Sequence, residues 1–283
     1  MYEIKSVVDD CRSHLTGGLI SGFDLWEMAI LPMLLYNCET WYDMSKNTVD
    51  MLEGLQLKFL RSVLAVGSGC PLPLLYSETG MICMELRILE KKLNFLHHLY
   101  HLPSSALAKE VLEIQTRNGL PGIYAECKEF LARFEVFDLS KFSKSQFKRF
   151  VKSKIKELNK NRYLELAKIK GYKKIDFNRL SDNDFELKAY LKELNVTDAR
   201  LKFKIVSQMT PGVKMNFQSD KKFAKDLWKC TDCAGSSVLG RRDTQQHLII
   251  CPGYEAFREG RNLDNDSDLI SYYKDILQHR MSS

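Results

Sequence analysis

Apolar residues recur at intervals of three and four over most of residues 45–208, while alternation with a period of two is nearly absent. Such intervals place apolar side chains along one face of an α-helix. Ser45 can cap the first of these helices, whose apolar positions include Val49, Leu52, Leu55, Phe59 and Val63. The pattern therefore predicts a mainly α-helical protein with little sheet.

Capping residues and helix breakers predict the helices that follow. Residues 85–102 carry apolar side chains on two sides, which is typical of a helix packed between others, and Pro103 ends that helix. Further helices are predicted to begin at Ser104 or Ser105, near Pro121, at Ser143, at Ser181 with Asp184, and at Thr197. The pattern leaves residues 18–42 open between a helix and a strand. It predicts an irregular connector at residues 70–80, which contain two prolines.

Composition divides the chain into three consecutive regions. A helical region covers residues 1–136, a basic helical region covers 137–210, and a small cysteine-containing module with a C-terminal helix covers 211–283. The longest apolar run, at 28–36, is far shorter than the roughly 20 residues of a membrane-spanning helix. The N-terminus is polar and several of the eight cysteines are scattered. We therefore expect an intracellular protein with reduced thiols, located in the nucleus or the cytoplasm and not in a membrane.

Positive charge is concentrated in residues 141–174, which hold thirteen Lys or Arg and two acids, a net charge of +11 in a chain of +6. Localised charge of this kind suits a polyanion such as RNA or DNA, although a solvated helix face is the alternative. Phe147, Val151, Ile155 and Leu158 form an apolar stripe on the predicted helix. The candidate nucleic-acid-binding residues on this helix are Lys148, Arg149, Lys152, Lys156, Lys160 and Arg162.

A second candidate site lies near the C-terminus, where four residues follow the pattern C-x2-C-x13-H-x3-C. They are Cys230, Cys233, His247 and Cys251. Two cysteines two residues apart can bind one ion from a turn, and a helical i, i+4 pair faces one way. The set predicts a tetrahedral structural Zn²⁺ site with no position left open for water. Arg241 and Arg242, between the ligand pairs, are further candidates for phosphate contact.

The sequence predicts no catalytic residues, because no phosphate-binding loop, dinucleotide fingerprint, nucleophile elbow or zinc-protease motif occurs. The pair Asp9 and Asp10 does not follow a hydrophobic strand, so it is unlike a two-metal carboxylate site. Three histidines on one predicted helix, His97, His98 and His101, have no cysteine or carboxylate nearby at ligand spacing except Glu90, seven residues before His97. We interpret them as surface or interface residues.

Three stretches resemble the C-terminal part of polyproteins from non-LTR (LINE-type) retrotransposons. LPMLLYNCETW at residues 31–41 resembles a motif just beyond the palm of their reverse transcriptase. The helix LEGLQLKFLRSVLAV at 52–66, with Gln56, Leu60 and Arg61, resembles part of their thumb. The C-terminal run CTDC…DTQQHLIICPGYEAFR resembles their Cys-Cys-His-Cys knuckle.

The resemblance implies a thumb-like region over residues 1–136 that grips the backbone of a template–primer duplex, and a knuckle that contacts RNA or DNA. The paired aspartates of a reverse transcriptase palm are missing, so no polymerase chemistry is expected from this chain. Two alternatives stay open. One is a domesticated remnant that acts as a helical scaffold without binding nucleic acid. The other, weaker one is an independent zinc-finger transcription factor, because a single finger reads only about three base pairs.

Overall fold

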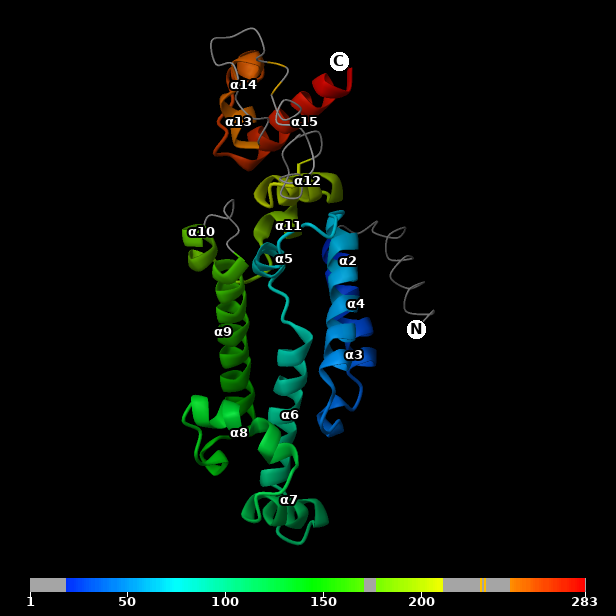
Figure 1. The fold of residues 1–283 in the computed structure, drawn as a ribbon, viewed down its shortest axis with the longest axis vertical. Coiled ribbons are helices and arrows are strands. Elements are labelled where there is room, and N and C mark those ends of the chain that lie inside the picture. The colour runs from blue at the N-terminus through cyan, green and yellow to red at the C-terminus, as the bar shows by residue number, and fades with distance from the viewer. Residues whose placement is uncertain (1–18, 171–176, 211–229, 231, 233–244, 283) are drawn as a thin grey trace. The chain divides into compact units, whose positions relative to one another are not determined.

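The structure is a computed structural model, and it describes residues 19–170, 177–210, 230, 232 and 245–282. These residues are mainly α-helical, which confirms the predicted fold class (Figure 1). Within the described ranges, β structure is limited to one isolated bridge between Thr79 and Leu187. The pattern left residues 18–42 open between a helix and a strand. In the structure, Leu19–Leu34 forms a succession of helical turns.

The chain divides into two compact units that are interleaved along the sequence. Unit 1 comprises residues 1–22, 60–80 and 167–283, and unit 2 comprises 23–59 and 81–166. Two unit boundaries fall inside the long helices α4 (Lys46–Leu64) and α9 (Lys144–Lys170). The contacts therefore divide the molecule differently from the three consecutive regions suggested by composition.

Unit 2 is built around α6 (Met84–Tyr100), against which several of its shorter elements pack. Its elements besides α4, α6 and α9 are the C-terminal part of α2 (Leu19–Leu25), η2 (Trp26–Ile30), α3 (Leu31–Leu34), η3 (Cys38–Thr40), α7 (Leu107–Arg117), α8 (Ile123–Arg133) and η4 (Leu139–Lys141). The indole of Trp26 is fully buried and stacks on Phe59 of α4, with ring centroids 4.5 Å apart. This contact fixes the N-terminal helical turns on α4.

Three buried or half-buried polar side chains hold residues 81–83, which lead into α6, and Met84, the first residue of that helix. Asn159 of α9 accepts from the Cys83 amide at 3.1 Å and donates to the Met81 carbonyl at 2.9 Å. Gln56 donates to the Ile82 carbonyl at 3.0 Å, and Glu53 accepts from the Met84 amide at 2.7 Å. Gln56, one of the residues that carry the resemblance, thus has a structural role here, because buried backbone groups require partners.

Unit 1 combines short helices with a C-terminal hydrophobic cluster. Its elements are α5 (Leu72–Thr79), α10 (Phe177–Asp182), α11 (Ala189–Glu193), α12 (Val196–Val206), α13 (Gln245–Ile250), η6 (Pro252–Tyr254), α14 (Glu255–Arg258) and α15 (Asp266–Ser282). The cluster joins Leu201 and Ile205 of α12 to Leu248 of α13 and to aromatic and aliphatic side chains of α15. Tyr272 also donates a hydrogen bond to the Leu248 carbonyl at 2.5 Å. This cluster supports the candidate metal ligands.

The predicted caps at Ser45 and Ser143 are confirmed. The Ser45 hydroxyl accepts from the Thr48 amide, and Ser143 exchanges hydrogen bonds with Gln146 in a capping box. The irregular connector predicted at residues 70–80 is wrong, since α5 occupies most of it. Pro71 and Pro73 lie at its N-terminal end, where proline is tolerated, and Gly80 closes it at a φ of +66°.

Three other predicted helix starts are displaced. α7 begins after Ala106 without a side-chain cap from Ser104 or Ser105. α12 is capped by the side chain of Asn195, which accepts from the Asp198 amide, and not by Thr197. The helix predicted from Ser181 is interrupted, because the side chains of Asn183 and Asp184 accept from backbone amides two residues on and form local turns.

Candidate functional site

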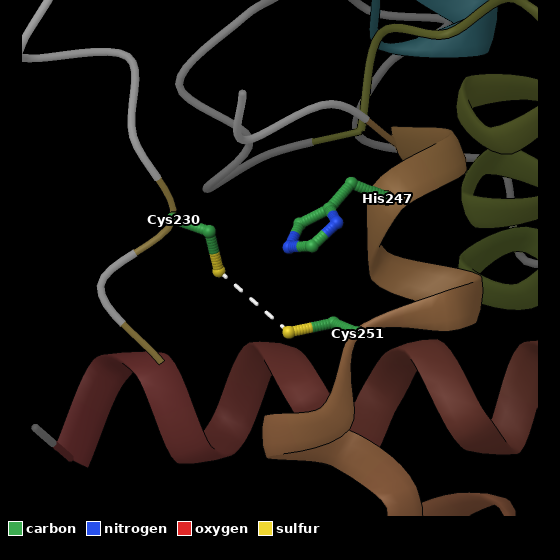
Figure 2. Close-up of side chains that lie close together, drawn as sticks. All are labelled: Cys230, His247 and Cys251. Carbon is green, nitrogen blue, oxygen red and sulfur yellow. Dashed lines mark hydrogen bonds between the residues drawn. The ribbon is translucent and has the colours of Figure 1, made fainter. Parts of the chain in front are cut away.

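Three of the four predicted metal ligands lie together in unit 1. The Sγ atoms of Cys230 and Cys251 are 3.8 Å apart, and these atoms and a ring nitrogen of His247 all lie within 4.8 Å of one another (Figure 2). Each side chain is at least 96% buried. A buried Cys-His-Cys cluster of this geometry can hold a metal ion. The fourth predicted ligand, Cys233, lies outside the described residues, as do Arg241 and Arg242.

The sulfur separation fits a shared ion better than a disulfide. Tetrahedral coordination with metal–sulfur bonds of about 2.3 Å places two sulfurs about 3.8 Å apart. A disulfide bond requires about 2.05 Å, and Cys230 and Cys251 are not joined by one. The two sulfurs therefore have the spacing that one tetrahedral ion requires.

The local sequence explains how the ligands converge. His247 lies in α13, and Cys251 follows the last residue of that helix, so that the two side chains are one helical turn apart. Pro252 then starts η6. Gly253 lies directly against the turn after Cys230, because a Cβ atom built on it would be 2.5 Å from the carbonyl oxygen of Asp232. A side chain at this position would push the two ligand segments apart.

Polar side chains surround the Cys230 sulfur. Asp232 accepts hydrogen bonds from the Tyr254 hydroxyl and from Arg280 Nη2, the latter at 3.2 Å, and Arg280 Nε donates to the Tyr254 oxygen at 2.6 Å. Burial, and then the hydrogen bond to Asp232, raise the pKa of the Tyr254 hydroxyl. Arg280 Nη2 and Asp232 Oδ2 are each 3.9 Å from the Cys230 sulfur, so a cationic and an anionic group both lie beside it.

The other four described cysteines differ from the candidate ligands because, among the described residues, none of them belongs to a cluster of three or more potential metal ligands. Burial raises the pKa of Cys38 and Cys83 to about 11 and that of Cys70 and Cys127 to about 12. Their thiols stay protonated near neutral pH. They behave as small core side chains.

The second candidate site, the basic helix, is α9. The predicted apolar stripe is confirmed, since Phe147, Val151 and Ile155 are buried and Leu158 is half-buried. The candidate cations lie on the other sides of the helix: Lys148, Arg149, Lys152, Lys156 and Arg162 are exposed, and Lys160 is half-buried. Arg162 forms an ion pair of 2.5 Å with Glu85. Its charge is therefore partly neutralised by a neighbour.

The interpretation of the three α6 histidines as surface or interface residues is wrong for His97. Its side chain is buried, with its ring between Phe147 of α9 and His101, at centroid distances of 4.6 and 4.1 Å. Its Nε2 lies 3.0 Å from the Phe142 carbonyl oxygen. Burial lowers the pKa of His97, so that its ring is neutral at physiological pH. The i, i+4 spacing of His97 and His101 serves aromatic packing here.

Sequence reasoning did not single out Asp232, Tyr254 and Arg280 around the cluster. Asp232 lies inside the C-x2-C turn, and Tyr254 is three residues after the last cysteine, so proximity in sequence could have indicated them. Arg280 is 29 positions beyond Cys251. Its position beside Cys230 depends on the packing of α15, which no local pattern specifies.

Among the described residues, no helix is both long and apolar enough to cross a membrane. Comparisons with protein-family models, curated proteins and solved structures found no match to this chain.

Proposed function

We propose that this chain is a non-catalytic nucleic-acid-binding part of a non-LTR retrotransposon reverse transcriptase, which grips the backbone of a template–primer and contains one structural zinc. The palm of such an enzyme would lie elsewhere in the parent polyprotein. The proposal includes no polymerase chemistry for this chain, because two-metal nucleotidyl transfer needs paired carboxylates that the sequence motifs do not provide.

The observation that carries the proposal is the separation of faces on α9. One side of the helix packs through Phe147, Val151 and Ile155, while four lysines at 148, 152, 156 and 160 follow one another at intervals of four. Residues four apart lie one above another on a helix, so these ammonium groups form a row. A row of cations matches the regular phosphates of a nucleic-acid backbone.

The proposed metal is Zn²⁺, with Cys233 as the fourth ligand beside Cys230, His247 and Cys251. Thiolate sulfur and imidazole nitrogen are the donors that structural zinc sites use. When bound, the ion would supply folding free energy to the C-terminal module and no chemistry of reaction. The convergence of Cys230, His247 and Cys251 supports a site for such an ion.

The test of nucleic-acid binding is its dependence on salt. If about five to seven cations contact phosphates, the logarithm of the affinity for duplex DNA should fall with the logarithm of salt concentration at a slope near −5 to −6. A variant with Lys148, Lys152, Lys156 and Lys160 changed to Glu should lose affinity for all sequences alike. Its slope should flatten by about 3 to 4, because phosphate contacts carry no base information.

The matched control compares two charges at a time: Lys192→Glu with Lys274→Glu, exposed lysines outside both α9 and the predicted thumb-like region, against Lys148→Glu with Lys152→Glu. The control variant alters the net charge of the chain equally but should leave most of the slope in place. Equal effects of the two variants would show that only net charge matters. No binding by the wild-type protein even at low salt would favour the domesticated scaffold and reject nucleic-acid binding.

A further inference from the structure

A cleft of about 490 Å³ in unit 2 lies between residues 31–39, α6 and the start of α9. Residues from LPMLLYNCETW contribute one wall, and the side chains of α6 and α9 contribute the rest. The polar and aromatic side chains in the lining include Glu39, Lys91, Phe95, His98, Lys144 and Lys148. A volume of this size is in the range of small-molecule sites and is sufficient for one nucleotide.

Glu39 of η3 contributes a half-buried carboxylate to the wall of this cleft. A carboxylate accepts hydrogen bonds only, and it therefore recognises groups with N–H or O–H bonds.

Positive charge lies around the same cleft. Lys144 and Lys148 are exposed and one helical turn apart at the start of α9. Lys91 is fixed at the rim, because its Nζ donates to the Leu35 carbonyl at 3.2 Å. Two further charges in the wall are Arg87, paired with Glu27, and Glu90. The lysines of α9 are thus suited to a phosphate group at the mouth.

An aromatic pair completes the cleft. Phe95 and His98 of α6 are stacked on each other, with ring centroids 6.4 Å apart and planes inclined by 30°. Phe95 is half-buried and His98 is exposed. Flat apolar rings are the surface on which the bases of single-stranded nucleic acids stack.

We propose that this cleft binds one nucleotide of a single-stranded nucleic acid, with the base among Phe95, His98 and Glu39 and its phosphate on Lys144 and Lys148. The inference rests on the proposed nucleic-acid binding and adds base selectivity to it. Glu39 selects bases that carry an exocyclic amino group, because a carboxylate accepts from the amino group of cytosine. Uracil presents a single ring N–H flanked by two carbonyl acceptors, which a carboxylate repels.

The experiment compares the binding of oligo(rC) and oligo(rU) of equal length to the whole chain at fixed salt. Wild-type protein should prefer oligo(rC) about tenfold, the discrimination expected of one charge-assisted hydrogen bond to a base. Glu39→Gln should remove most of this preference, because an amide offers both a donor and an acceptor. Lys144→Gln with Lys148→Gln should weaken both ligands equally and keep the preference, since phosphate contacts do not read bases.

The matched control is Glu110→Gln, which removes one exposed carboxylate from α7 outside the cleft and should change neither affinity nor preference. The wild-type comparison needs no variant to fold, so it decides by itself. Equal affinity for the two oligonucleotides, with a steep salt slope, would overturn the nucleotide cleft and leave the proposed function intact. Absence of binding to both at low salt would overturn the two proposals together. If Glu39→Gln keeps the preference for oligo(rC), Glu39 does not select the base.

Discussion

The C-terminal cluster and the histidines of α6 both contain potential metal ligands four positions apart, at helical spacing. Their side chains are nevertheless arranged differently. His247 and Cys251 are four positions apart, and so are His97 and His101. In the first pair the ligand atoms converge with Cys230. In the second, Nε2 of His97 faces the Phe142 carbonyl and Nδ1 of His101 faces the His97 carbonyl, while the rings pack on one another.

The difference lies in where the third partner comes from. The turn after Cys230 is brought to α13 by the close approach at Gly253 and by the Asp232–Tyr254–Arg280 network. The partner of the α6 histidines is Phe147, an aromatic ring of α9. A helical i, i+4 pair of potential ligands can therefore hold a metal ion only when the packing provides further ligand atoms.

The strongest test of this contrast is Cys251→Ser. Loss of one thiolate from a buried cluster should abolish stoichiometric zinc, which in wild-type protein purified without chelator should be about one ion per chain. Because metal binding supplies folding free energy, amide exchange should speed up in α13–α15 and stay slow in α6. Metal analysis and hydrogen exchange measure the two effects.

The matched control for Cys251→Ser is Cys127→Ser, which changes a core thiol of unit 2 and should leave the zinc content unchanged. Cys233→Ser should behave like Cys251→Ser if Cys233 is the fourth ligand. Full zinc binding by Cys251→Ser would show that the cluster is a packing arrangement of the same kind as the histidines.

An intermediate effect is expected of Gly253→Ala, which tests whether close packing of the two segments builds the site. The new methyl group would meet the Asp232 carbonyl at 2.5 Å, closer than real contacts allow, so one segment must move. Overpacking of this kind costs about 1 to 3 kcal/mol, and zinc affinity should fall with it. Chelator competition measures the affinity, and urea unfolding measures the stability.

Gly54→Ala serves as the control for Gly253→Ala, because a Cβ at residue 54 of α4 meets open space. It should be neutral or stabilise the protein by up to about 1 kcal/mol. If Gly253→Ala binds zinc as tightly as wild-type protein, the close approach is not what positions the ligands.

The smallest effect concerns pH and the stacked histidines. Burial lowers the pKa of His97 in the folded protein below its value of about 6.5 in the unfolded chain. Its neutral form therefore contributes stability that is fully present above pH 6.5 and is lost as the pH falls through the folded-state pKa. His97→Gln retains an N–H donor for Phe142 and does not titrate, so urea midpoints at pH 7.5 and 5.5 should differ less in this variant than in wild-type protein.

Zinc content should be unaffected by His97→Gln, which separates the two histidine environments directly. Other titrating groups, including the metal ligands, are common to both proteins and cancel in the comparison. An equal or greater pH dependence in His97→Gln would mean that the stack tolerates protonation.

The elements that sequence patterns predicted well are those with local causes. α4, α6 and α9 follow from apolar periodicity, and Ser45 and Ser143 cap helices through neighbouring residues. The ligand spacing around His247 identified three residues that do meet. The patterns could not predict contacts between residues that are distant in sequence. Examples are the hydrogen bond from the Cys83 amide to Asn159 and the position of Arg280 beside Cys230.

Two of the errors, in contrast, have local physical causes. The 70–80 segment contains prolines that are compatible with the first turn of a helix, so their presence did not exclude α5. Asn183 and Asp184 ended a helix by bonding to nearby amides, which periodicity does not register. His97 looked polar in the sequence, but its ring is large and apolar enough to be buried once the ring nitrogen faces a carbonyl.

The hydrophobic cluster that joins α12 to α15 has a practical consequence for the design of fragments. Leu201 and Ile205 pack with Leu248 and Tyr272, so a recombinant piece that starts at residue 211 would leave part of this surface open to water and prone to aggregation. The compositional boundary at 210 is therefore a poor cloning site. A soluble C-terminal fragment should begin before Asn195, the residue that caps α12, and should be tested for zinc uptake in that form.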